Sequence, residues 1–173
     1  MTPQAPKTIV IGYGNPGRQD DGLGPAVITA LTEMHLPNVT LDADYQLTVE
    51  DAAAVAEHDV VVFVDAAIDG PAPFSFRPIG PGEEATFSSH SVPPETVLRL
   101  AIDLFGSHAE GYVLGIRGYD FDEFDEALSG RAASNLAEAV RFIESVLRKY
   151  SFREAVTAAH ESKPAIAVSK GEL

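Results

Sequence analysis

The sequence predicts a single α/β domain: a twisted, mostly parallel sheet of about five strands with helices on both faces. Short β-branched runs alternate with segments of helical periodicity, the order that right-handed strand–helix–strand crossovers produce. One run, Val60–Val64, is entirely apolar, as expected of a strand buried on both faces of a parallel sheet. The length of 173 residues suits one domain with a substantial core.

The N-terminal half alternates strands and helices in a regular order. A buried strand at Thr8–Ile11 leads into a glycine-rich turn, and a helix is expected from Pro25, because proline fits the first helical turn. Val39–Ala43 is typical of a second strand. The alanine-rich segment Val49–Glu57 predicts a short helix before the apolar strand Val60–Val64.

The C-terminal half continues the alternation. Phe74–Ile79 lies between prolines and predicts a short edge strand, since proline cannot donate to an interior ladder. A helix opens at Pro93–Pro94 and closes at Gly106, and Tyr112–Ile116 predicts a further strand. A long amphipathic helix follows, with one apolar face made by Leu136, Val140, Ile143 and Leu147. From about Ser151 we expect a short helix and then a loose tail.

Charge and composition exclude several classes of protein. Twelve basic residues against 26 acidic ones give a net charge of −14, which argues against nucleic acid or an anionic membrane as a partner. The absence of cysteine rules out a disulfide, a thiolate nucleophile and a cysteine-based zinc site. The N-terminal segment lacks a signal-peptide pattern, and the longest apolar run is too short to cross a bilayer. We therefore expect a cytoplasmic protein.

The loop Gly12–Gly24, GYGNPGRQDDGLG, is the most informative stretch. It contains GxGxxG at a strand-to-helix turn, but Asp20 and Asp21 stand where a dinucleotide would place its pyrophosphate, and the two carboxylates would repel it. A purely structural role is open, in which each acid favours the helix macrodipole by about 0.3–1 kcal/mol. The surrounding glycines are also consistent with a backbone shaped to present a carboxylate.

Two further residues are expected at the same edge of the sheet. Asp65 follows the apolar strand Val60–Val64, and His90 lies in a loop before the helix that opens at Pro93–Pro94. Separately, Asp65 could cap a helix or turn, and His90 could be an ordinary loop residue. Together with the Gly12–Gly24 loop, however, they could supply two carboxylates and one imidazole to a divalent metal ion such as zinc or nickel.

Three segments in this order resemble the hydrogenase maturation endopeptidases: GYGNPGRQDDGLG after a first strand, VVFVDAA at a third, and SSHSVPPETVLRLA before a helix. The resemblance covers Ile9 to about Ile116. It implies a phosphorylase/hydrolase-like fold, with a single α/β protease domain at residues 1–150 and a C-terminal helix or tail at 151–173. It also implies an enzyme that removes the C-terminal extension of a [NiFe] hydrogenase large-subunit precursor after nickel insertion.

The same resemblance implies roles for individual residues. Asp21, Asp65 and His90 match the positions of the family's metal-contacting residues, so they are the expected catalytic and metal-binding set. Nickel is expected to arrive with the precursor, which is the expected partner; no nucleic acid or membrane partner is expected. Asp44–Leu47 departs from the family's glycine-rich stretch, which we interpret as a difference in the large subunit recognised.

Two alternatives remain open at this point. The Asn-Pro-Gly turn is similar to that of peptidyl-tRNA hydrolases, although the net charge of −14 and the Asp-Asp-Gly sequence depart from that family. The second alternative is a maturation chaperone that binds a metal or a partner protein and does not cleave the partner. An intact metal site does not by itself establish peptide-bond cleavage.

Overall fold

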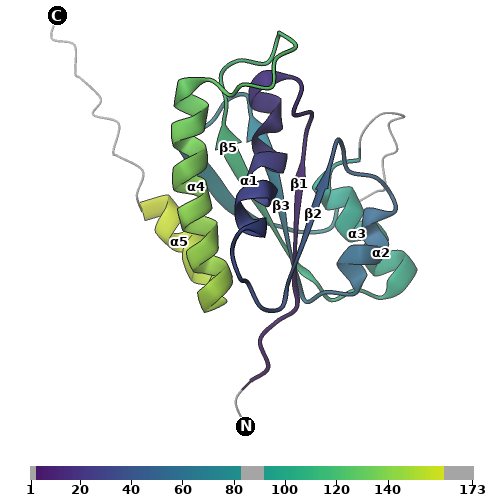
Figure 1. Cartoon of the computed structure of the whole chain (residues 1–173). Coiled ribbons are helices and arrows are strands. Elements are labelled where there is room, and N and C mark those ends of the chain that lie inside the picture. The colour runs from purple at the N-terminus through teal and green to yellow at the C-terminus, as the bar shows by residue number, and fades with distance from the viewer. Residues whose placement is uncertain (1–2, 83–91, 162–173) are drawn as a thin grey trace, which may run out of the picture.

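The structure is a computed structural model that describes residues 3–82 and 92–161. Within these residues, five strands form one sheet in the order β2-β1-β3-β5-β4 (Figure 1). Their bounds are β1 Thr8–Tyr13, β2 Val39–Asp44, β3 Val60–Ala67, β4 Phe74–Ile79 and β5 Glu110–Arg117. All neighbouring pairs are parallel except β4 with β5. The predicted fold class is confirmed, including the edge position of β4.

Helices cover both faces of this sheet (Figure 1). Their bounds are α1 Leu23–Thr32, α2 Asp51–Ala56, α3 Pro94–Phe105, α4 Gly130–Lys149 and α5 Phe152–Glu161. Helices α1, α4 and α5 pack on one face, and α2 and α3 on the other. Gly106 ends α3 in the left-handed conformation, with φ 65°, as its sequence position predicts.

The core is divided between the two faces by the alternation of side chains along β3. Val62 and Val64 point toward α1 and α4, whereas Val61 and Phe63 point toward α2 and α3. All four are fully buried. This strand is therefore buried on both faces and fixes the centre of the sheet.

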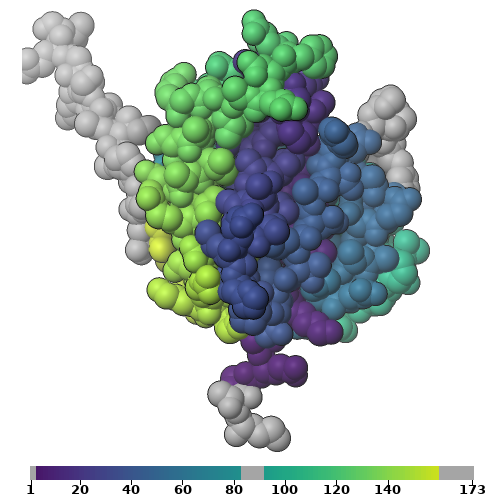
Figure 2. All heavy atoms as spheres, viewed as in Figure 1, coloured from purple at the N-terminus to yellow at the C-terminus, as the bar shows by residue number. Residues whose placement is uncertain are grey.

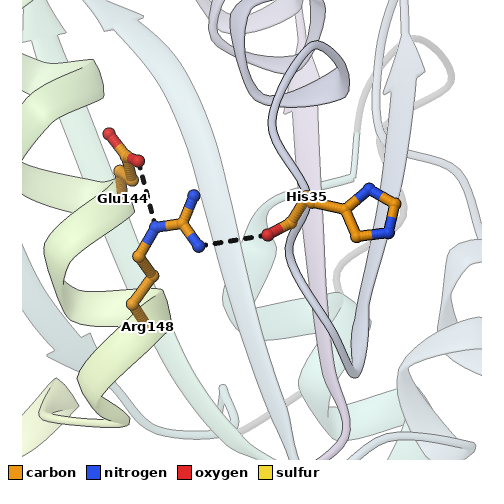
Figure 3. Close-up of polar contacts among 3 residues, drawn as sticks. All are labelled: His35, Glu144 and Arg148. Carbon is orange, nitrogen blue, oxygen red and sulfur yellow. Dashed lines mark hydrogen bonds and ion pairs between the residues drawn. The ribbon is translucent and has the colours of Figure 1, made fainter.

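A polar contact joins the far end of α4 to the chain that follows α1 (Figure 3). Arg148 donates from its Nε to Glu144 one turn earlier, at 3.0 Å, and from a terminal nitrogen to the carbonyl oxygen of His35 at 3.1 Å. The exposed ion pair stabilises the helix only by about 0.3–0.5 kcal/mol. Its contact with His35 also links two of the helices that cover this face, α1 and α4.

Two sequence expectations are corrected. Helix α1 begins at Leu23 rather than Pro25, after a short 3-10 turn, η1, at Gln19–Gly22. Strand β3 does not end at Val64, because β5 continues to pair with it as far as Ala67; Asp65 therefore lies inside the strand. The acidic residues between 122 and 126 lie in the loop before α4, whose N-cap is Ser129.

Candidate active site

The carboxyl ends of β1 and β3 lie at the point where the chain reverses its direction across the sheet. From β1 the chain passes through α1 to β2 on one side, and from β2 it returns through α2 to β3 on the other. The β1–β3 pairing ends at Gly12 and Val64. In open α/β sheets, ligands bind outside the strand ends at such a reversal. The sequence places acids on both strand-end segments.

Asp65 is the first β3 residue beyond the pairing with β1, and it still pairs with Gly115 of β5. Its side chain is half-buried. Burial raises the pKa of Asp65 to about 6. Hydrogen bonds from the N–H of Ala66 and from the hydroxyl of Tyr13 oppose that rise, and the negative charge of Asp21 adds to it. The charge of Asp21 therefore acts on the Asp65 carboxyl across the end of the sheet.

Tyr13 is a member of this site that the sequence analysis did not select. It is the last residue of β1, and by strand alternation it shares the face of Ile9 and Ile11, toward α2 and α3. Burial and the neighbouring charge of Asp65 raise the pKa of Tyr13, so its hydroxyl keeps its proton and donates to Asp65. The alternation and the position at the strand end were visible in the sequence and could have identified it.

Asp21 lies in η1, above the end of β1. Its Oδ2 accepts a hydrogen bond from the backbone N–H of Asn15 at 2.8 Å, which closes the turn between β1 and η1. Gly14 makes this turn possible: it has φ 139°, and a Cβ there would lie 2.0 Å from the carbonyl oxygen of Asp21. The glycine at position 14 is thus explained by the close approach of the η1 backbone at Asp21 to the end of β1.

Gly24 brings the first turn of α1 against the same strand ends. A Cβ on Gly24 would lie 2.4 Å from the carbonyl oxygen of Tyr13 and 2.6 Å from that of Val64. Only a residue without a side chain permits this approach. The helix start, η1 and the ends of β1 and β3 therefore form one closely packed unit.

Asp20 has a different environment from its neighbour. It is fully buried, and its carboxylate accepts from the backbone N–H groups of Tyr119, Asp120 and Ser129 and from the Ser129 hydroxyl, all within 2.7–2.9 Å. Burial alone would raise the pKa of Asp20, but these hydrogen bonds outweigh it and hold the pKa below its ordinary value. Asp20 binds the chain before α4 and does not face the Asp65 side of the sheet.

The structure brings two of the three predicted site residues together. Asp21 and Asp65 interact through their charges at the end of the sheet, while His90 lies outside the described residues. In residues 3–82 and 92–161, no group of three or more His, Cys, Asp or Glu side chains is arranged to hold a metal ion. The two carboxylates thus form an incomplete ligand set within that part of the chain.

Comparison with known proteins gives structural neighbours only. No protein-family model matches the chain, and no curated protein sequence matches it. The [NiFe] hydrogenase maturation protease HycI from Thermococcus kodakarensis is 24% identical, with a TM-score of 0.64 over 85% of this chain and 95% of that one. The hydrogenase maturating endopeptidase HybD from Escherichia coli is 18% identical, with a TM-score of 0.65 over 83% and 93%.

A third solved structure, the hydrogenase 2 maturation peptidase from a Thaumarchaeota archaeon, is 22% identical, with a TM-score of 0.59 over 82% of this chain and 97% of that one. In each comparison nearly the whole neighbour is matched, so the likeness extends over the entire fold of each neighbour. At these identities the likeness establishes the fold, and the activity has to be argued from the site.

Proposed function

We propose that this chain is an endopeptidase that removes the C-terminal extension of a [NiFe] hydrogenase large-subunit precursor after nickel insertion. The observation that carries the proposal is the pair Asp21 and Asp65. The two carboxylates come from different strand-end segments and interact at the topological reversal of the sheet. The fold that holds them is shared with three maturation proteases over more than four fifths of this chain.

The donor chemistry of this pair fits a divalent cation carried by a substrate. The raised pKa of Asp65 reflects burial and the nearby negative charge of Asp21, so a cation between them would relieve an unfavourable concentration of charge. We assign Asp21, Asp65 and His90 as the residues that contact nickel in the precursor. Bound nickel would supply Lewis-acid polarisation of a water molecule or of the scissile carbonyl.

The chain's own residues prepare this site before the precursor arrives. Asn15 holds one oxygen of Asp21, and Tyr13 donates to Asp65, so both carboxylates are oriented in the free protein. The proposed ligands are two carboxylates and one imidazole, and a set of this kind without a thiolate holds nickel weakly. A weak site of this kind fits a protein that recognises a metal ion bound to its partner and does not retain a metal ion of its own.

The remaining properties agree with a protein partner. The net charge of −14 disfavours nucleic acid. Among the described helices, none is long and apolar enough to cross a membrane. A cytoplasmic location belongs to the same proposal.

The direct test incubates the purified chain with a nickel-loaded large-subunit precursor and follows the mass of the precursor. Release of a C-terminal fragment by the wild-type chain, and not by Asp21→Asn, supports the proposal. Asp69→Asn is the matched control, because Asp69 is an exposed acid in the loop after β3 and its loss should leave cleavage intact. A stable complex with a full-length precursor would instead identify an escort protein.

A further inference from the structure

The loop between β5 and α4, residues 118–129, is bound to the turn that carries Asp21. The backbone N–H of Asp20 donates to the carbonyl oxygen of Asp120 at 2.9 Å, and that of Gln19 donates to the carbonyl oxygen of Asp125 at 2.7 Å. The side chain of Gln19 in turn accepts from the N–H of Glu123 at 3.2 Å. With the four hydrogen bonds to the Asp20 carboxylate, these contacts attach the 118–129 loop to η1 along most of its length.

The attachment also fixes the backbone of η1 in an uncommon conformation. Gln19 has φ 50°, in the left-handed region that non-glycine residues rarely adopt. Such a conformation persists only where the surroundings determine it, and both the backbone and the side chain of Gln19 are bound by the 118–129 loop. The position of η1, and of Asp21 within it, therefore depends on this loop.

The start of the 118–129 loop, at Tyr119, is also bound to α4. The Tyr119 ring lies within cation–π distance of Arg117 at 5.2 Å and of Arg131 at 3.8 Å. Asn135 of α4 donates to the Tyr119 hydroxyl at 3.1 Å and to the carbonyl oxygen of Arg117 at 3.0 Å. Both ends of the loop are thus anchored, through Tyr119 at one end and through Ser129, which binds Asp20, at the other.

This anchored loop nevertheless presents an aromatic side chain and a strong negative charge to solvent. Phe124 is 88% exposed, and the guanidinium of Arg18 lies 5.7 Å from its ring centroid. Residues 118–129 contain no Lys or Arg. They carry five exposed acids: Asp120, Asp122, Glu123, Asp125 and Glu126. In Figure 2 the green atoms of this region form one end of the molecule, beside purple atoms of the N-terminal part of the chain.

Resting on the proposed function, we propose that the 118–129 loop is a docking surface for the precursor, with Phe124 as its apolar anchor. The segment that it binds carries an apolar side chain for the Phe124 ring and basic residues for the surrounding acids, because the loop offers only negative charge. An aromatic group on a fixed backbone loses little conformational entropy on binding. Since the same loop holds η1, bound precursor is positioned relative to Asp21.

The test measures the dissociation constant of the nickel-loaded precursor by calorimetry, and its cleavage by mass spectrometry, for two phenylalanine variants. Phe124→Ala should weaken binding about tenfold and leave the melting temperature unchanged, because the side chain is exposed. Phe105→Ala is the control: Phe105 is 55% exposed at the opposite end of the sheet, where α3 ends, and its loss should not change binding.

A second variant tests the charge of the surface. Replacing three acids by their amides, Asp122→Asn, Glu123→Gln and Glu126→Gln, should weaken binding at low salt and flatten its salt dependence. Equal binding by wild type, Phe124→Ala and Phe105→Ala would overturn the docking inference even if the precursor is cut. Absence of any fragment with wild type would overturn the proposed function, while the binding series would still decide whether this loop docks the precursor.

Discussion

Asp20 and Asp21 are neighbours in sequence with opposite environments. Asp20 is fully buried and bound by four hydrogen bonds from the 118–129 loop. Asp21 is partly exposed, holds the Asn15 N–H and lies near Asp65. The first acid is therefore a structural anchor, and the second is available to a ligand. Substitution by asparagine keeps the size of each side chain and separates the two roles.

Asp20→Asn should lower the free energy of unfolding by about 2–4 kcal/mol, because an amide cannot accept all four hydrogen bonds and carries no charge to strengthen them. Asp21→Asn should change that free energy by less than about 1 kcal/mol and abolish precursor processing. Denaturant unfolding and the mass assay measure the two effects. Equal losses of stability for both variants would contradict these assignments.

Asp65 should make the protein less stable as the pH rises. Its pKa is raised to about 6 by burial and then by Asp21, so the folded protein holds a proton that the unfolded chain releases near pH 4. The resulting stability is present at low pH and is lost as the pH rises through about 6. Asp65→Asn cannot ionise, so its melting temperature relative to wild type should increase between pH 5 and pH 7.5. A difference that is constant with pH would show that Asp65 titrates normally.

At the scale of elements, the short turn between β1 and α1 determines where the acids lie. Gly14→Ala should cost more than about 2 kcal/mol, because the new Cβ would meet the carbonyl oxygen of Asp21 at 2.0 Å and the residue has φ 139°. Gly130→Ala is the control, since a Cβ added there, at the start of α4, would meet nothing within 4 Å. A Gly14→Ala protein as stable as the control would show that this turn can relax.

Local pattern predicted most of the elements. The prolines around β4 indicated an edge strand, and Gly106 indicated the end of α3, because both residues act through their own backbone. The end of β3 could not be read in the same way: Asp65 stays in the strand because Gly115 of β5 pairs with it, 50 residues later in the chain. Strand ends set by a neighbouring strand are not visible in local sequence.

The candidate site was predictable to a similar extent. Parallel strand ends meet at one edge, so Asp21 and Asp65 could be placed together from the sequence. The role of Asp20 could not, because its partners lie about 100 residues away in a loop without regular structure. The contribution of His90 stays a prediction, since that residue lies outside the described part of the chain.

At the scale of the whole molecule, the proposed activity depends on an ion that the partner brings. Asp21 and Asp65 form an oxygen-rich site, incomplete within the described residues, at the edge of a sheet whose fold is shared with maturation proteases. Alone, such a site should hold nickel weakly, and it becomes complete only when the precursor presents its metal. Cleavage should therefore depend on whether nickel is bound to the precursor.

Dependence of cleavage on the nickel in the precursor can be measured directly. The metal-free chain is mixed with precursor that is either nickel-loaded or nickel-free, and the C-terminal extension is followed by mass spectrometry. The extension should be released only from the nickel-loaded precursor. Equal release from both precursors would contradict this prediction, because the two carboxylates would then act without the metal that they are proposed to recognise.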